Sequence, residues 1–488
     1  MKKIRLIKSK NAFLLGLILI LCYGCERDIS DEAVPATFPT IGDIFTDTPI
    51  GLTEEFFNSF DPAAGANVNG FGTDNAEAYE GSTSIRIDVP APNDPDGGFI
   101  GGIFEDAGEG RNLTQYDALT FWAKGSTTGI VEAGFGTDFV EDKYAVSFPN
   151  IQLSTDWKKY IIPIPDPSKL VQEKGMFLFA AGTQSTNGFG FTFWIDELRF
   201  ENLGTLGQEV PRIFNGANLV QEAFIGSTIQ INGISYTANL PSGINQTINA
   251  APSYFEFSSS NESVATVSEL GVISVSGVGT TTITATLGNN VALGELELTS
   301  VGPFPSAPVP TRDAANVISL FSDAYTNVPV RHYNGFFEPF QTTEGGAGAD
   351  PNNVDLQVPA PGGGVDNIIN YTSLNFVSIG TYDTVPLVDI SAMSHLHVDI
   401  NVRETIDGGD FLRISLESGT GVGPTTSGNF IINSAALGNT DENGWLSLDI
   451  PISSFSGFSD PANLGQVFFV TDATISDIWV DNVYFYNE

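Results

Sequence analysis

The stretch FWIDELRF, residues 193–200, and the stretch IWVDNVYF, residues 478–485, are two copies of one pattern. In both, a tryptophan is followed by an aliphatic residue, an aspartate, a polar residue, an aliphatic residue, a variable residue and a phenylalanine. Apolar residues that recur at alternate positions are typical of a half-buried β-strand. We therefore predict that each stretch is the closing strand of its own β-domain.

Two further pairs of segments precede these strands in the same order. DWKKYIIPI at 156–164 corresponds to GWLSLDIPI at 444–452, and NLTQYDALTFW at 112–122 corresponds more weakly to DISAMSHLHVD at 389–399. A shared order of matches indicates two homologous modules, whereas chance resemblance between β-rich segments would not keep it. Each module consists of short alternating segments separated by Gly, Asn, Asp and Pro, which predicts an all-β fold of β-sandwich or jelly-roll type.

Composition and charge restrict the class of protein. A chain of 488 residues is too long for one core. Its 52 glycines, 27 prolines and 36 phenylalanines, against 3 methionines, favour strands and turns over helices. The formal net charge is −38, and no lysine follows Lys174. Such a chain repels nucleic acid and strongly anionic polysaccharides, so a neutral ligand is expected.

The N-terminal residues have the pattern of an export signal. Five basic residues precede the apolar run AFLLGLILILCYG, which suits a signal peptide at 1–24. The sequence LCYGC resembles a bacterial lipobox, which implies that Cys25 is acylated; an ordinary cleaved signal with a chance cysteine is the alternative. Residues 25–44 then form an acidic tether, and ERDISDEA resembles the surface-export signals of Bacteroidota lipoproteins. The mature chain would have no cysteine pair and no disulfide.

Between the modules lies a segment of different character. SYFEFSSSNESVATVSELGVISVSGVGTTTITATLGN, residues 253–289, resembles the bacterial immunoglobulin-like group 2 domain, which implies a small β-sandwich over 206–301. Residues 302–311 follow as a linker with four prolines, and this density favours a semi-rigid polyproline II conformation.

No catalytic motif is recognisable. The chain has no H-E-x-x-H, G-x-S-x-G or Walker sequence. Counting residues does not exclude a glycosidase carboxylate pair in a chain with 58 acidic residues. The lack of recognisable chemistry in both large modules favours binding over catalysis.

Resemblances to known families make this expectation more specific. The segments YEGSTSIRIDV at 79–89 and DALTFWAKG at 117–125 give the first module, 45–205, a likeness to jelly-roll carbohydrate-binding modules. The segments PTRDAANVISLFSDAYTNVPV at 310–330 and NYTSLNFVSIG at 370–380 make the last module, 312–488, resemble a module found in secreted polysaccharide-degrading enzymes and surface glycan-binding lipoproteins of Bacteroidota.

The whole arrangement resembles SusE/SusF-type proteins of polysaccharide-utilisation loci. This resemblance implies a non-catalytic lipoprotein on the outer-membrane surface, attached to the membrane only through its lipid. It also implies capture of a neutral polysaccharide, with laminarin-type β-1,3-glucan favoured, and transfer to a SusC/SusD-type porin system. A glycoside hydrolase or lyase, or a surface adhesin or matrix protein, stays open as an alternative.

Aromatic residues are the first candidates for sugar contact, because the C–H faces of sugar rings pack on them. In the first module, alternation places Trp122 on the face opposite the core, with Trp194 as its neighbour. In the second, the aromatic loop 331–340 is either a binding platform or a plug under the sandwich. The residues favoured for the platform are Tyr333, Phe336 and Phe337.

Polar candidates lie on neighbouring segments of the second module. His397, Asp399 and Arg413 alternate with aliphatic residues, so we expect them to line one polar face, with His397 and Arg413 as ligand contacts. A solvated face without a ligand is the alternative.

The aspartate of each closing strand is a candidate metal ligand. Asp196 and Asp481 stand between apolar residues, and a buried carboxylate needs compensation. The resemblance to jelly-roll modules implies a structural calcium ion there, with Glu54 or Glu55 as partner in the first module and Asp323 in the second. The alternatives are a solvent-paired aspartate or a cap on backbone N–H groups.

Overall fold

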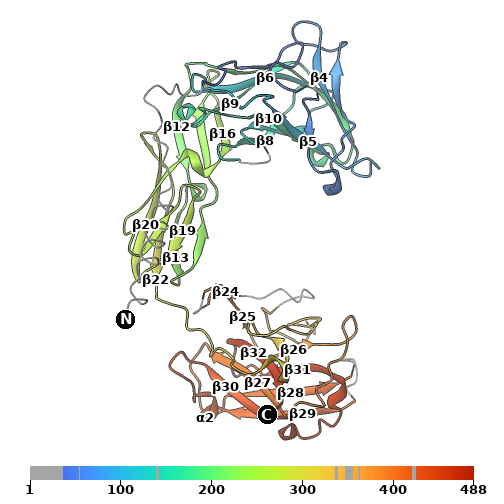
Figure 1. Cartoon of the computed structure of the whole chain (residues 1–488), viewed down its shortest axis with the longest axis vertical. Coiled ribbons are helices and arrows are strands. Elements are labelled where there is room, and N and C mark those ends of the chain that lie inside the picture. The colour runs from blue at the N-terminus through green and yellow to red at the C-terminus, as the bar shows by residue number, and fades with distance from the viewer. Residues whose placement is uncertain are drawn as a thin grey trace, which may run out of the picture. The chain divides into compact units, whose positions relative to one another are not determined.

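The computed structural model describes residues 37–53, 55–138, 142–335, 339–346, 356–360, 363–419 and 425–488. The expected signal peptide, Cys25 and most of the tether lie outside these residues. The chain divides into two compact units, residues 1–206 and 207–488, each of which is described by itself (Figure 1). No helix within the described ranges has the length and apolar character that a membrane crossing requires.

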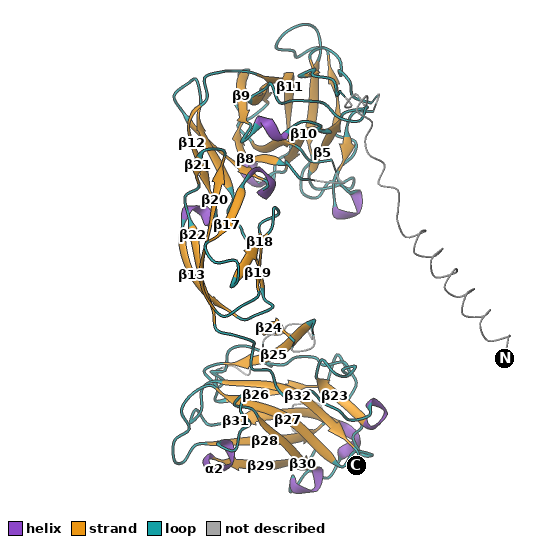
Figure 2. Ribbon diagram, turned by 60° about the vertical axis from the view of Figure 1, so that its left-hand side comes forward, coloured by secondary structure: helices purple, strands orange, loops and turns teal. Residues whose placement is uncertain are grey.

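Strands dominate the described residues (Figure 2), so the prediction of an all-β fold is confirmed. One short α-helix, α2, covers Ser434–Leu437. The 3-10 turns are η1 (Pro62–Ala64), η2 (Pro167–Lys169), η3 (Gln184–Thr186), η4 (Phe214–Gly216), η5 (Pro252–Tyr254), η6 (Ala314–Asn316), η7 (Ile452–Ser454) and η8 (Pro461–Asn463).

The first unit consists of two packed sheets. One has the order β3-β4-β11-β6-β9, with β1 also paired to β11; its strands are β1 (Asp43–Phe45), β3 (Phe71–Asp74), β4 (Ser84–Val89), β6 (Ala118–Gly125), β9 (Lys158–Pro163) and β11 (Phe191–Glu201). The other runs β2-β5-β10-β7-β8; its strands are β2 (Asn58–Ser59), β5 (Ile100–Glu105), β7 (Ile130–Phe135), β8 (Val146–Gln152) and β10 (Gly175–Ala181).

Alternation along the strands builds the core of this unit. Successive side chains of a strand point to opposite faces, so Phe177 and Phe179 of β10 face inward together. They meet rings of the other strands edge to face, as in the pair Phe104–Phe179, whose centroids are 6.2 Å apart. The abundance of phenylalanine in the sequence therefore has a packing role here.

The second unit begins with the immunoglobulin-like segment. Its strands form the neighbours β12-β15-β16, a sheet β13-β22-β20-β17 with β21 on β20, and a sheet β14-β19-β18. The strands are β12 (Gly207–Arg212), β13 (Asn218–Ala223), β14 (Thr228–Gln230), β15 (Ser235–Asn239), β16 (Asn245–Ala250), β17 (Glu256–Ser259), β18 (Ala265–Val267), β19 (Val272–Val275), β20 (Gly279–Leu287), β21 (Asn290–Val291) and β22 (Glu295–Ser300).

The C-terminal module is again a pair of sheets around one core. The first has the order β24-β25-β32-β27-β30, with β23 paired to β32; its strands are β23 (Val317–Phe321), β24 (Leu356–Pro359), β25 (Val365–Tyr371), β27 (His395–Val402), β30 (Leu446–Pro451) and β32 (Ile478–Tyr486). The second has the order β26-β31-β28-β29; its strands are β26 (Phe376–Gly380), β28 (Phe411–Ser418), β29 (Ser427–Asn433) and β31 (Leu464–Val470).

The two modules share one topology, as the repeated motifs predict. The order β3-β4-β11-β6-β9 of the first corresponds strand for strand to β24-β25-β32-β27-β30 of the second, and β1 on β11 corresponds to β23 on β32. The run β5-β10-β7-β8 corresponds to β26-β31-β28-β29. The repeated tryptophan-aspartate stretch is the central strand of the first sheet in both modules.

The aspartate in each central strand holds a bulge. Glu197 and Asn482, which follow the two aspartates, have left-handed φ angles of 49° and 52°. The pairing register with β6 and β27 shifts at these points. An Asp196 carboxylate oxygen accepts from the N–H of Glu197 at 2.8 Å, and an Asp481 oxygen accepts from Asn482 at 2.6 Å. The aspartate thus satisfies an amide that the bulge removes from the ladder.

The proline-rich linker packs on the C-terminal module along part of its length. Phe304 and Ala307 are buried in a small cluster with Trp445. The indole N–H of Trp445 donates to the carbonyl of Pro305 at 2.6 Å. The linker is therefore attached to the module by burial and hydrogen bonds, in addition to the stiffness expected from its prolines.

A buried guanidinium anchors the start of the first module. The Arg111 side chain is 2% exposed, and its Nε donates to Asp106 at 2.7 Å. Its other nitrogens donate to the carbonyls of Ile41, Asp43 and Ile50. These contacts attach residues 41–50 to the loop after β5.

Replacement of Arg111 by methionine should destabilise the first module by about 3–5 kcal/mol, because it leaves the Asp106 charge and three carbonyls without this partner. The exposed Arg86, whose side chain pairs with Asp74 and Asp88 at the surface, is the matched control, and its alanine variant should cost about 1 kcal/mol or less. Urea unfolding of the full chain measures both, and equal midpoints for the two variants would contradict the anchoring role.

Asp481 should make the C-terminal module less stable as pH rises. Burial, with the nearby charges of Asp366, Asp399 and Asp323, raises the pKa of Asp481 well above its usual value. A carboxyl whose pKa is raised on folding destabilises the folded state when it is ionised. This destabilisation is nearly absent at about pH 4, grows as the pH rises, and is complete above the raised pKa. In EDTA, Asp481→Asn should raise the melting temperature at about pH 7.5 and leave it nearly unchanged at about pH 4. Calorimetry of the full chain measures this, and an equal gain at both pH values would contradict it.

Candidate functional site

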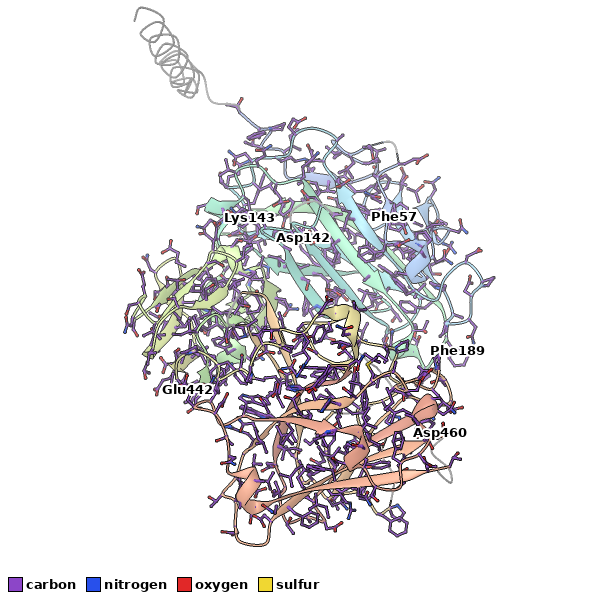
Figure 3. The ribbon with its side chains drawn as sticks, turned by 60° about the horizontal axis from the view of Figure 1, so that its bottom comes forward. Phe57, Asp142, Lys143, Phe189, Glu442 and Asp460 are labelled. Atoms are coloured by element: carbon purple, nitrogen blue, oxygen red, sulfur yellow. The ribbon has the colours of Figure 1, made fainter. Side chains whose placement is uncertain are left out.

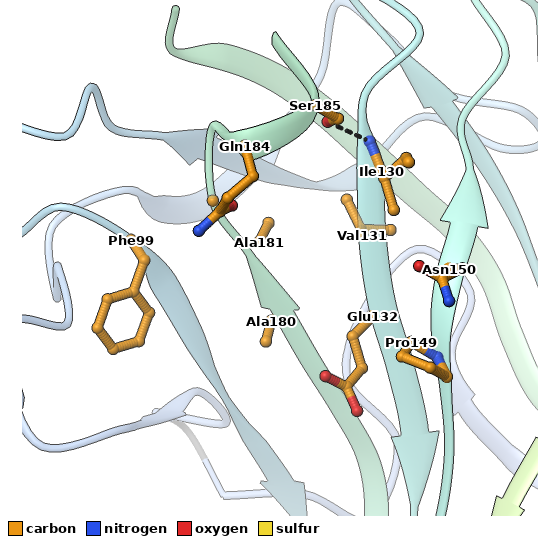
Figure 4. Close-up of a pocket in the computed structure, with 11 residues that line it drawn as sticks. Phe99, Ile130, Val131, Glu132, Pro149, Asn150, Ala180, Ala181, Gln184 and Ser185 are labelled. Atoms are coloured by element: carbon orange, nitrogen blue, oxygen red, sulfur yellow. Dashed lines mark hydrogen bonds between the residues drawn. The ribbon is translucent and has the colours of Figure 1, made fainter. Parts of the chain in front are cut away.

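The first module has a hollow on the outer face of the sheet β5-β10-β7-β8. Alternation turns Ala180 of β10, and Ile130 and Glu132 of β7, away from the core. The hollow has a volume of about 490 Å³. Figure 4 shows its floor of strand residues with Phe99 on one side and Glu132, Pro149 and Asn150 on the other.

Small residues create this depression. Ala180, Ala181 and Gly182 line the floor, and larger side chains at these positions would fill the space. Phe99 and Ile130 add apolar surface. The Ser185 hydroxyl accepts from the N–H of Ile130 at 2.9 Å, which ties the loop that carries it to the edge of the hollow. The result is a hollow with an apolar floor.

Three polar side chains in the hollow have unused hydrogen-bonding capacity. In the described part of the chain, no hydrogen bond involves the carboxylate of Glu132 or the amide groups of Asn150 and Gln184. Together they offer acceptors from the carboxylate and both donors and acceptors from the amides. Neither lysine nor arginine is among the lining residues. Apolar floor and polar rim are the combination that binds the ring faces and hydroxyls of a neutral sugar.

The structure places Trp122 and Trp194 on the other sheet, β3-β4-β11-β6-β9, away from this hollow. The ring of Tyr79 stacks on Trp122 at a centroid distance of 3.7 Å, and the indole N–H of Trp194 donates to Asp74 at 3.0 Å. Lys124 lies over the Trp194 ring at 5.8 Å. Both indoles are half-buried and already have neighbours. Their contact with sugar stays a prediction, but the two rings do not line the hollow.

The prediction for Tyr333 is wrong. Its ring is 3% exposed within the core of the C-terminal module, and its hydroxyl donates to the carbonyl of Leu320 at 3.2 Å. Burial raises the pKa of this phenol to about 12. This ring is the plug of the alternative interpretation, because the apolar residues around it exclude a ligand. Phe336 and Phe337 lie outside the described residues.

The prediction that His397, Asp399 and Arg413 line one polar face is also wrong. His397 and Asp399 lie on β27 of one sheet, and Arg413 lies on β28 of the other. Alternation along a strand does not reveal which of two sheets the strand joins. Arg413 instead faces outward on β26-β31-β28-β29.

His397 belongs to a packed charge network. Its Nδ1 lies 2.9 Å from an oxygen of Asp449 and its Nε2 lies 3.4 Å from Asp399, while its ring stacks on Tyr484. Burial lowers the pKa of His397, but the hydrogen bonds and charges of the two carboxylates outweigh it and leave the pKa raised. Both ring nitrogens and the ring face of His397 are therefore in contact with residues of the module, and these contacts give the side chain a structural role.

The predicted metal ligands have different surroundings in the two modules. Asp196 accepts backbone N–H groups of Tyr79 at 2.8 Å and Glu80 at 3.1 Å, in addition to Glu197, so it is the backbone cap of the alternative interpretation. Glu55 is exposed. Asp481 instead lines a cavity of about 290 Å³ together with Asp323 and Asp366.

No three histidine, aspartate or glutamate side chains converge well enough to hold a metal ion among the residues that the structure places. Calcium at Asp481 stays a prediction of the family resemblance. Sequence reasoning missed Asp366, although it lies in β25 beside a repeated strand. It also missed Glu132, an acid between two buried residues of β7 that alternation could have identified.

Family comparisons cover two parts of the chain. Residues 43–202 match carbohydrate binding domain 30, and residues 235–294 match the bacterial Ig-like domain of group 2. Neither match extends into the C-terminal module. A comparison with curated proteins finds no match.

Several solved structures are similar to parts of the chain. The family 30 carbohydrate-binding module of a cellulosomal cellulase of Clostridium thermocellum is 18% identical, covers 33% of this chain and 96% of its own, and has a TM-score of 0.24. A family 11 module from the same organism, in complex with a β-1,3-1,4-mixed-linked tetrasaccharide, is 20% identical, covers 33% of this chain and 98% of its own, with a TM-score of 0.21. A β-1,2-glucanase from Parabacteroides distasonis is 12% identical over 54% of this chain and 39% of its own, with a TM-score of 0.26.

Both matched domains belong to non-catalytic families. The chain is therefore a multidomain carbohydrate-binding protein, with a family 30-type carbohydrate-binding domain at residues 43–202 and a bacterial immunoglobulin-like domain at residues 235–294.

Proposed function

We propose that this protein captures a neutral polysaccharide without cleaving it, through the hollow on β5-β10-β7-β8. The proposal rests on the side chains of Glu132, Asn150 and Gln184. They line a hollow with an apolar floor, and no described residue forms a hydrogen bond with them. Sugar hydroxyls supply the missing partners, and a ring face packs against Phe99.

Charge selects the class of polysaccharide. Glu132 is the one charged residue among those that line the hollow, and the whole chain has a net charge of −38. An anionic glycan would meet repulsion without a compensating cation in this hollow. The proposed ligand is therefore uncharged, and a laminarin-type β-1,3-glucan is the favoured candidate from the family resemblance.

The proposed place of action rests on the N-terminal sequence. A basic and apolar leader before Cys25 supports export and lipid attachment, and the acidic residues after it support display on the outer-membrane surface. We propose that a SusC/SusD-type porin system receives the captured glycan. The polysaccharide would then be held near the cell by a protein that leaves cleavage to separate enzymes.

Variants of the hollow should test the binding site. Phe99→Ala and Glu132→Gln should each weaken laminarin binding roughly tenfold, because one removes the packing surface and the other weakens a charged acceptor. Phe189→Ala is the matched control: Phe189 lies on the loop that follows Gln184 and Ser185, is 75% exposed and stands out from the surface (Figure 3), but it is not among the lining residues.

Affinity electrophoresis in gels with laminarin, xylan, mannan or alginate measures the effect. Trp194→Ala, on the other sheet, distinguishes the two faces of the module. If it abolishes retardation while Phe99→Ala and Glu132→Gln do not, the binding face is the one with the indoles. Release of reducing ends from any of these glycans by the wild-type protein would contradict the absence of catalysis.

A further inference from the structure

The C-terminal module has a hollow on the sheet that corresponds to the binding sheet of the first module. The order β26-β31-β28-β29 is the counterpart of β5-β10-β7-β8. Its hollow has a volume of about 430 Å³, and the residues that matter for its chemistry are Phe376, Arg413, Glu417, Asn429, Phe468 and Asp472. We infer that this hollow is a second sugar-binding site, in a module that neither family match covers.

The pairing register shows that these side chains form one outward surface. Arg413 is opposite Val470, which is opposite Phe376. In the adjacent row, Ser415 lies between Phe468 and Asn429. The intervening residues of β28, namely Leu412, Ile414 and Leu416, are fully buried in the core. Two aromatic rings and a set of polar groups therefore lie together on one face of the four neighbouring strands β26, β31, β28 and β29.

The polar groups of this surface suit the hydroxyls of a sugar. No described residue forms a hydrogen bond or ion pair with the Arg413 guanidinium, which leaves its donors available. The Asn429 side-chain oxygen accepts from the Ser415 hydroxyl at 2.6 Å, so the amide N–H groups of Asn429 stay directed elsewhere. Glu417 is half-buried, and no described residue forms an ion pair with it. Burial raises the pKa of its carboxyl.

The apolar part of the surface suits the ring face of a sugar. Phe376 and Phe468 are both half-buried and line the hollow. They lie on the neighbouring strands β26 and β31, at a diagonal position that long side chains can span. Aromatic surface beside donors and acceptors is the arrangement that orients a pyranose.

The charges favour an uncharged glycan for this site as well. Arg413 supplies one positive charge, and Glu417 and Asp472 supply two carboxylates, so the cation does not make the hollow positive. The two hollows nevertheless differ, since the first has one aromatic residue and no cation among its lining residues. We therefore expect the two sites to differ in affinity for the same oligosaccharide.

Isothermal titration of the full mature chain tests this inference separately from the first site. The titrants are laminarihexaose, cellohexaose, xylohexaose and mannohexaose. In a chain whose first hollow is inactivated by Phe99→Ala and Glu132→Gln, at least one of these four should still bind. Adding Arg413→Ala should then weaken that binding roughly tenfold or more, because the variant removes the only cationic hydrogen-bond donor among the residues that line this hollow.

Two further variants keep the result unambiguous. Arg331→Ala is the matched control, because Arg331 pairs with Asp383 at 2.9 Å and does not line the hollow; it should leave binding unchanged. Asn429→Ala removes an exposed side chain and should reproduce the loss, so it replaces Arg413→Ala if that variant fails to fold. The inference is overturned if none of the four sugars binds the chain with the inactivated first hollow, or if binding survives both Arg413→Ala and Asn429→Ala. If the first hollow is not a binding site, a chain that carries Arg413→Ala and an intact first hollow should bind none of the four sugars.

Discussion

The structure depends on one local constraint, which is the aspartate at the centre of each module's middle strand. Asp196 and Asp481 each accept the N–H of the next residue, which has left the sheet ladder through a left-handed φ angle. β11 and β32 pair with strands on both sides, so an unsatisfied amide there would be buried and costly. The bulge in turn shifts the register of the adjacent strand, which sets which residues of β6 and β27 face inward. The same eight-residue pattern thus occupies the same place in both modules.

The same duplication explains where the candidate sites lie. The sheet with the central strand is occupied on its outer face by packed side chains, such as Tyr79 on Trp122 and His397 between two carboxylates. The opposite sheet has an outer face with small residues or with unpaired polar groups, and both hollows are found there. The two hollows retain the same position but differ in their aromatic and charged residues, as expected when binding residues change on a constant scaffold.

Charge acts at two levels in this protein. Across the whole chain, a net charge of −38 disfavours nucleic acid and anionic polymers as ligands. Within the modules, buried carboxylates require local compensation, and the two modules solve this differently. Asp196 is surrounded by backbone N–H groups, whereas Asp481 shares its surroundings with Asp323, Asp366 and Asp399 and has its pKa raised. Buried cations are used sparingly, as with Arg111, whose donors hold the first strand segment in place.

The sequence by itself determined the all-β class, the immunoglobulin-like segment and the duplicated modules, because alternation and repeated motifs are local properties of the chain. It also separated inward from outward residues along single strands, such as Leu119 and Phe121 from Trp122. Only the tertiary structure decided which strands share a sheet. In the structure, Arg413 and His397 lie on different sheets and Tyr333 is buried. The candidate hollow contains Glu132 and does not contain Trp122, and Asp366 and Asp481 line one cavity. The reason is physical: a strand's pattern specifies its two faces, but its neighbours depend on contacts between residues far apart in the chain.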